Sequence, residues 1–230
     1  GSRFVSLLCQ HRRQHLRADA QGDTDLRGGL KMQTKKEYIQ NAIVRAATEE
    51  FLTYGFAGSS MRRMAQNAGT GMSNFYNYFR SKEDLFAFLV EDRAKAIHTL
   101  FDRLLAEDYT ASFQTITEHR ALLYNLRRWT TRFDILYNRE TLLLLTEKTG
   151  ALSQETRMYL TDSMTEVLLK LAARDRAGRL PDRYPLRHFV SQLLNNMLET
   201  ALSMKEDPEI KEILRNQLVT AVAGFYLLLN

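Results

Sequence analysis

The sequence predicts an all-α fold, in which a small N-terminal helical unit precedes a larger C-terminal helical domain. Two observations predict this fold. Only 3 Pro and 11 Gly interrupt the 230 residues, which favours long helices over a fold with many turns. Apolar residues recur at spacings of three and four along much of the chain, and no stretch alternates with a period of two clearly enough to indicate a strand.

Composition is that of an ordinary globular protein. Hydrophobic residues make up 44% of the chain and charged residues 26%. The single cysteine, Cys9, excludes an internal disulfide framework and a cysteine-based zinc site, and His11 and His15 lack a third metal ligand. No apolar run approaches the length of a membrane span. We therefore expect a cytoplasmic protein without a membrane partner, a metal or a cofactor.

The first 31 residues are interpreted as an N-terminal extension. Gly1 and Ser2 are typical of a protease-cleavage scar, and residues 3–31 are either a natural extension or an upstream start before Met32. Residues 1–31 carry six Lys or Arg against three acids, and residues 32–82 carry seven against three. Since the whole chain has a net charge of only +5, this basic third indicates contact with a polyanion, with a solvated tail as the alternative.

Four helices are predicted in the first half of the chain. The first carries an apolar stripe from Tyr38 to Tyr54 and ends at Gly55, where a left-handed cap is suitable. Serines then offer an N-cap to a second, short helix, and a glycine allows a turn before a third. The N-cap is Ser59 or Ser60, and the two short helices are expected at 61–67 and 71–78, with Gly69 in the turn between them. Ser81, with Asp84, is expected to cap a longer fourth helix.

Two short helices joined by a glycine-containing turn and flanked by longer helices describe a helix-turn-helix unit. In the second short helix, Phe75 and Phe79 lie four residues apart and anchor it inward. Small and polar side chains are left to face a DNA major groove, where Asn is a natural bidentate partner for adenine. The outward residues are Met72, Ser73, Asn74 and Asn77, and the surrounding phosphate donors are Arg62, Arg63, Tyr76, Tyr78 and Lys82.

The segment from residue 35 to residue 90 resembles the tetracycline-repressor (TetR) family of transcriptional regulators. The resemblance lies in the Gly-aromatic corner at Gly55-Phe56, the Ala68-Gly69 turn, the Tyr76-Asn-Tyr-Phe79 step and the Ser81-Lys-Glu83 entry to the fourth helix. The chain departs from the family at Thr70, where an aliphatic residue is usual, and at Gly71, where Ser or Thr commonly begins the recognition helix. Thr70 is expected to act as a cap instead.

The resemblance implies a ligand-responsive repressor that binds a palindromic DNA operator as a homodimer and releases it when a small-molecule effector binds. It divides the chain into an extension at 1–31, a DNA-binding domain at 32–82 and an effector-binding and dimerisation domain at 83–230. By the same resemblance, bases are read by Arg62, Met72, Ser73, Asn74 and Asn77, and phosphates are held by Ser60, Arg63, Tyr76, Tyr78 and Lys82.

Beyond residue 90 the resemblance is one of architecture, a run of helices that ends in two strongly amphipathic ones. In the family, the last two helices form a four-helix interface with their partners, although such stripes also suit a monomer core. The residues expected in the dimer interface are Phe189, Leu193, Met197, Leu214, Leu218, Val222 and Phe225. Those expected around an effector pocket are His98, His119, Tyr124, Trp129, Tyr137, Met158 and Met164, with core filling as the alternative.

Two other classes of function remain open at this stage. A helical enzyme is disfavoured because the sequence shows no nucleophile–base set, no Gly-rich phosphate loop and no group of metal ligands. A helical scaffold that binds another protein would differ from a DNA-binding protein in salt dependence, because neutralised phosphates make affinity fall steeply with salt. The arginines of the extension, Arg12, Arg13, Arg17 and Arg27, either enter a minor groove or belong to a mobile tail.

Overall fold

The computed structural model describes residues 26–107, 119–148, 150–174 and 181–229, and these residues are helical with no strand among them. The all-α fold class is confirmed. The described chain divides into two compact units inside one helix, after Glu91. Within the described residues, no helix combines the length and the hydropathy that crossing a membrane requires.

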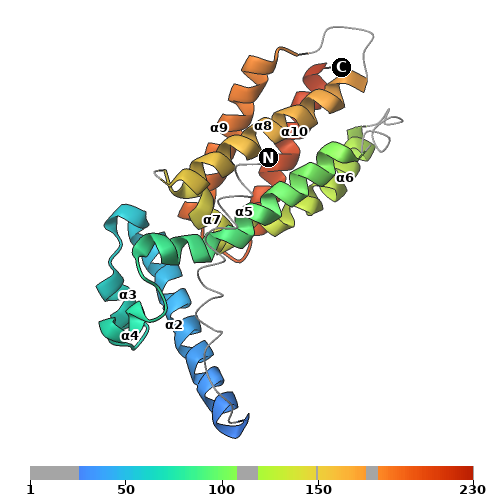
Figure 1. The fold of residues 1–230 in the computed structure, drawn as a ribbon. Helices are drawn as coiled ribbons and strands as arrows, with labels where there is room; N and C mark the ends of the chain where they lie inside the picture. The colour runs from blue at the N-terminus through green and yellow to red at the C-terminus, as the bar shows by residue number, and fades with distance from the viewer. Residues whose placement is uncertain (1–25, 108–118, 149, 175–180, 230) are drawn as a thin grey trace. The chain divides into compact units, whose positions relative to one another are not determined.

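The first unit contains α2 (Leu26–Gly58), α3 (Met61–Asn67), α4 (Met72–Tyr76) and the beginning of α5 (Lys82–Ala106). The short helix α3 packs against the long α2, and α4 packs against α3 (Figure 1). Gly55 has φ 67° and ψ 173°, so the regular helix ends there and a short continuation leads to Gly58. The predicted helix end at Gly55 is therefore confirmed, whereas α2 begins earlier than its apolar stripe indicates.

Aromatic rings form much of the core of the first unit. The rings of Phe51 and Phe56 stack with their centroids 5.7 Å apart, and Phe86 meets both edge-on at 5.3 Å. Phe86 lies on α5, so this cluster joins the first helix of the unit to the last. The entry to α5 is capped as predicted, because the Asp84 backbone N–H donates to Ser81 Oγ at 3.1 Å.

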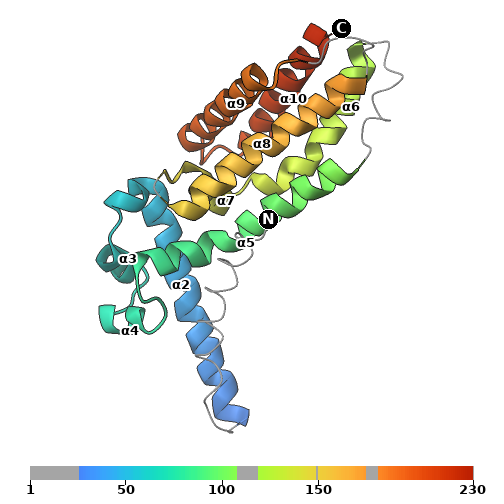
Figure 2. The same ribbon diagram turned by 45° about the horizontal axis from the view of Figure 1, so that its top comes forward.

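Among the described residues, the second unit is a bundle built from the rest of α5 and the helices that follow it. These are α6 (His119–Thr130), α7 (Arg139–Thr146), α8 (Ala151–Arg174), α9 (Arg183–Ser203) and α10 (Ile210–Leu229), with the 3₁₀ helix η2 (Thr131–Leu136) after α6. In this unit α8 packs against α9, and α10 packs against α6 (Figure 2). Its core includes Phe101, Trp129 and Phe133, whose rings meet at 5.0–5.8 Å.

Candidate nucleic-acid interface

The turn between α3 and α4 follows from one glycine. Gly69 has φ +67°, a conformation that only glycine adopts readily. Its N–H donates to Gln66 O, and the N–H of Thr70 donates to Ala65 O, each at 3.0 Å. These two bonds are the Schellman pattern that closes the end of a helix. The chain therefore leaves α3 sharply, and α4 can begin three residues later.

The recognition helix α4 is held by two phenylalanines. Phe75 and Phe79 are fully buried, and their ring centroids lie 6.4 Å apart. Asn77 and Tyr78, which were predicted to be helical, lie in a turn after α4, because their N–H groups bond to carbonyls only three residues back. With the phenylalanines directed into the core, the other side of α4 faces outward.

The residues predicted to read bases are exposed to different degrees. Arg62, Ser73 and Asn77 are exposed, whereas Met72 and Asn74 are half-buried. The Asn74 side-chain amide donates to Thr70 Oγ1 at 2.8 Å. Gly71 occupies the N-cap position of α4, and no side chain caps the helix there, so the cap expected from Thr70 is not formed. The Thr70 hydroxyl accepts the hydrogen bond from Asn74 instead.

Lys82 is tied to the end of α2 and to the residue that follows it. Its Nζ donates to the backbone carbonyls of Phe56 at 2.7 Å and Ser59 at 3.3 Å, and lies 4.6 Å from the centroid of the Phe56 ring. These partners are neutral carbonyls, so neither of them compensates the positive charge of the ammonium. An ammonium has three N–H donors, and two of them are used here. Lys82 thus stabilises the end of α2 while its charge remains available to a phosphate.

Arg63 has a different environment, because it forms an ion pair with Glu50 on α2. Its Nε donates to Glu50 Oε1 at 2.8 Å, and its Nη2 lies 2.5 Å from the same oxygen. Nη2 also donates to Gly58 O at 2.7 Å, and the guanidinium lies over the Tyr54 ring at 4.6 Å. The hydrogen bond to Glu50 raises the pKa of Arg63. This pairing was not visible in the sequence, because the partners are 13 residues apart.

The other predicted phosphate donors lie around the same short helices. Ser60 stands at the N-cap position of α3 but makes no side-chain cap; its backbone N–H instead donates to Glu50 Oε1 at 2.9 Å. Tyr76 is half exposed and Tyr78 is partly buried. The first unit thus gathers every predicted DNA-contacting residue around α3, α4 and the start of α5.

In the second unit, the residues predicted around an effector pocket are dispersed. Trp129 and Met164 are buried, whereas Tyr124 and Met158 are 67% and 59% exposed. The side chain of His119 lies outside the described residues. Burial and the nearby charge of Asp134 raise the pKa of Tyr137, whose hydroxyl is buried and has no hydrogen-bond partner among the described residues.

His98 belongs to a cluster that the sequence did not indicate. Its ring stacks on that of Tyr159 with centroids 3.7 Å apart, and Tyr159 donates to Asp102 Oδ1 at 2.5 Å. Burial lowers the pKa of His98, against the opposing effect of Asp102. Burial and the hydrogen bond to Asp102 raise the pKa of Tyr159 to about 12. The cluster joins α5 to α8 within the second unit.

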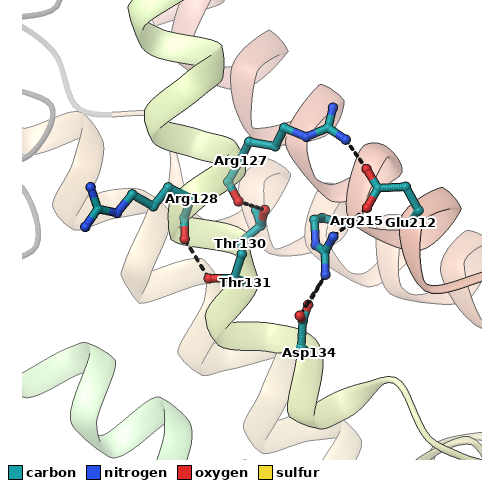
Figure 3. A network of polar contacts seen from close by, with 7 residues as sticks. All are labelled: Arg127, Arg128, Thr130, Thr131, Asp134, Glu212 and Arg215. Carbon is teal, nitrogen blue, oxygen red and sulfur yellow. Dashed lines mark hydrogen bonds and ion pairs between the residues drawn. The ribbon is translucent and has the colours of Figure 1, made fainter.

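A network of ion pairs connects α6 and η2 to α10 (Figure 3). Arg127 pairs with Glu212, which also accepts from Arg215, and Arg215 donates to both carboxylate oxygens of Asp134 at 2.7–2.8 Å. The hydrogen bond to Asp134 is the main cause of the raised pKa of Arg215. Alternating signs of charge fix the relative register of these elements.

The residues predicted in the dimer interface fall into two groups. Leu214, Leu218 and Val222 on α10 are buried within the subunit. Phe189 is 40% exposed, and Leu193, Met197 and Phe225 are partly exposed. Along α9 only Leu186 and Val190 are buried, although leucines and one methionine continue toward its end. The helix therefore presents more apolar surface than its own subunit covers.

The geometry of the first unit defines a class of protein. Two short helices joined by a tight turn, with the second anchored by two phenylalanines and polar on its outer side, form a helix-turn-helix unit. Residues 43–89, which span this unit, match the model of the bacterial regulatory proteins of the tetR family. Over these residues the chain is similar to that family of regulatory proteins.

Two curated relatives are similar to part of the chain. The chain is 32% identical over 77 residues to an uncharacterized HTH-type transcriptional regulator, YdgC, of Bacillus subtilis; the match covers 34% of the chain and 40% of the relative. It is 29% identical over 111 residues to an HTH-type transcriptional regulator of Mycobacterium tuberculosis, covering 46% and 47%. The chain thus matches less than half the length of these relatives.

The fold also resembles a solved structure. A member of the TetR transcriptional regulator family from Streptomyces coelicolor A3 superposes with a TM-score of 0.51 at 20% identity, over 79% of this chain and 89% of that one. At this identity the likeness concerns the fold alone. Because the likeness covers 79% of this chain, the similar fold includes part of the helical second unit.

Proposed function

We propose that the protein is a sequence-specific DNA-binding regulator of transcription that acts as a homodimer, with repression as its default output. The observation that carries this proposal is the recognition helix α4, anchored by Phe75 and Phe79 with Ser73 and Asn77 exposed beside it. Asn and Ser offer the donors and acceptors that read base edges in a major groove. Lys82 and Tyr76 would contact the flanking phosphates.

The proposed dimer is supported by the apolar surface of α9. Phe189, Leu193 and Met197 on α9, with Phe225 on α10, are the interface residues that the subunit leaves at least partly exposed. Leu214, Leu218 and Val222 are assigned to the core instead, because their own subunit buries them. Two-fold symmetry would place two recognition helices on a palindromic operator, with half-sites about one helical turn, roughly 34 Å, apart.

An effector site within the second unit is supported by buried polar atoms. The hydroxyls of Tyr137, Thr141 and Ser153 are buried without hydrogen-bond partners among the described residues. Each such group costs about 1–3 kcal/mol when it is left unsatisfied. A small molecule with matching polar groups would satisfy them. It would release DNA only if it bound more tightly to the conformation with splayed recognition helices.

The test begins with DNA. Bound sequences are selected from a random duplex pool with the purified protein, and the enriched motif is then titrated against a scrambled duplex at several salt concentrations. We expect an inverted repeat, bound by a dimer, with an affinity that falls steeply as salt rises. A protein that enriches no motif and ignores duplexes at low salt would contradict the proposal and favour a protein-binding scaffold.

The effector is tested separately. Small molecules are screened for those that raise the melting temperature, because a ligand that binds only the folded state stabilises it. Each positive compound is then added to the preformed complex with the selected operator. Release of the DNA would support induction by that compound. Compounds that stabilise the protein without altering DNA affinity would contradict the proposed release mechanism.

A further inference from the structure

Glu50 is an acidic residue at a position of α2 where the spacing of buried residues predicts an apolar side chain. It lies on the buried face of α2 with Ile43, Ala47 and Phe51, and is only 3% exposed. An ionised carboxylate in such a place is strongly unfavourable unless charge and hydrogen bonds compensate it. The negative charge of the Glu50 carboxylate therefore has to be compensated by neighbouring groups of the first unit.

Three N–H groups at the start of α3 meet a single oxygen of this carboxylate. Glu50 Oε1 accepts from the Ser60 backbone N–H at 2.9 Å and from Arg63 Nε at 2.8 Å, and Arg63 Nη2 lies 2.5 Å away. Arg63 is further held by Gly58 O and by the face of Tyr54. Glu50 thus fixes the beginning of α3 on α2 and determines where the Arg63 side chain lies.

The pair also changes how much charge the helix-turn-helix unit offers to DNA. Lys82 bonds to neutral carbonyls and keeps its charge, whereas the charge of Arg63 is balanced by Glu50 at contact distance. A neutral pair attracts phosphates far less than a single cation at the same place. Each cation that neutralises a phosphate adds about 0.9 to the slope of log affinity against log salt on B-DNA, whatever the sequence.

We infer that Glu50 is a positioning residue that anchors α3 and keeps Arg63 from acting as a phosphate contact, which limits sequence-independent binding to DNA. The inference rests on the proposed function, because it concerns how strongly the same unit binds DNA. It also corrects one expectation from the sequence. The Arg63 side chain is 44% exposed, but its charge is paired with that of Glu50, so Arg62, which is also exposed, remains the arginine available to DNA.

The first variant separates charge from position. In Glu50→Gln, the side-chain oxygen can still accept from Ser60 and Arg63, but the negative charge is gone. We expect binding to a scrambled duplex to become tighter, and its salt slope to become steeper by about 0.9, because Arg63 then carries an uncompensated charge. Glu49→Gln is the matched control, since it removes the same charge from an exposed position one residue away.

The second variant replaces the whole pair and does not depend on a buried single substitution. Glu50→Met with Arg63→Met exchanges a neutral ion pair for two apolar side chains, a change that folded proteins often tolerate. We expect its salt slope to equal that of the unaltered protein. If Arg63 contacted a phosphate, the slope would become shallower by about 0.9.

Both measurements use the full chain, with circular dichroism melts to show that each variant is folded. A Glu50→Gln slope equal to that of Glu49→Gln, or a shallower slope for the double variant, would overturn the inference. If Glu50→Gln does not fold, the double variant alone decides. Failure of the unaltered protein to bind any duplex would count against the proposed function itself, so the two failures are distinguishable.

Discussion

The ammonium group of Lys82 lies 4.6 Å from the centroid of the Phe56 ring and donates to the backbone carbonyl of the same residue. The two residues are 26 positions apart, so this contact joins the start of α5 to the end of α2. The same lysine therefore stabilises the first unit and supplies it with a positive charge that its carbonyl partners do not compensate. Substitution of Lys82 should affect both stability and DNA binding.

For Lys82→Ala we expect weaker binding to every duplex, specific and scrambled alike, and a salt slope shallower by about 0.9. Fluorescence anisotropy titrations at four or five salt concentrations measure both quantities. Lys170→Ala is the matched control, because Lys170 Nζ also donates to a backbone carbonyl, that of Leu105, but in the second unit. A loss confined to the specific operator would contradict the assignment of Lys82 to phosphate.

Asn77→Ala tests base reading. Asn77 is exposed just after α4, so its side chain can be removed without opening the core. We expect a loss of roughly 1–3 kcal/mol at the base pair it reads, with unchanged affinity for scrambled DNA. Operators carrying single base-pair changes locate that position. Equal losses on specific and scrambled duplexes would show that Asn77 does not discriminate between bases.

Gly55→Ala tests the break near the end of α2. Gly55 has φ 67° and ψ 173°, a region that is essentially restricted to glycine, and among the described residues no heavy atom lies within 4 Å of an added Cβ. Backbone strain alone should therefore lower the free energy of unfolding by about 1–3 kcal/mol. Gly71→Ala is the control, because Gly71 has φ −78° and equal space, and should be close to neutral. Urea titrations compare the two variants.

The pH dependence of stability should report on His98. Burial lowers the pKa of His98, so below about pH 6.5 the unfolded chain binds a proton more readily than the folded chain does. Its contribution to stability is present above that pH and is lost as pH falls toward the lower folded-state pKa. We expect His98→Gln to melt with a weaker dependence on pH between 7 and 5. Identical profiles for both proteins would exclude this role.

The proposed dimer predicts a difference between two neighbouring positions on α9. Leu193→Glu places a charge on the partly exposed apolar surface, whereas Gln192→Glu places the same charge on an exposed polar position. Burying an unpaired carboxylate in an interface is costly, so only the first variant should give monomers. Sedimentation velocity measures the outcome. A Leu193→Glu protein that remains dimeric would place the interface elsewhere.

Local patterns predicted the elements of the first unit well. Helix α3 occupies the predicted 61–67 because serines precede it and a glycine turn follows it. Helix α4 is shorter than predicted, because the chain between Phe75 and Phe79 tightens into a turn. Both phenylalanines nevertheless reach the core. Spacing of apolar residues indicates which side is buried more reliably than how far a helix extends.

Contacts between distant residues were beyond the sequence. The pairing of Arg63 with Glu50 depends on how α3 packs against α2, and a residue pattern within either helix does not specify it. The amphipathic stripe of α10 likewise showed an apolar face but not what covers it. Leu214, Leu218 and Val222 are covered by their own subunit, whereas α9 is left with the exposed apolar surface. Periodicity shows that a helix has an apolar face, whereas tertiary packing decides whether its own subunit covers that face.

The hydrogen bond from Asn74 to Thr70 has a consequence for recognition at the operator. An amide nitrogen carries two N–H groups, so the second N–H and the carbonyl oxygen of Asn74 are left for a base edge. Immobilising a flexible side chain on binding costs about 0.5–1.5 kcal/mol, and here Thr70 orders the amide before DNA arrives. Thr70, which has no expected base contact of its own, would thereby preorganise Asn74 for reading the DNA sequence.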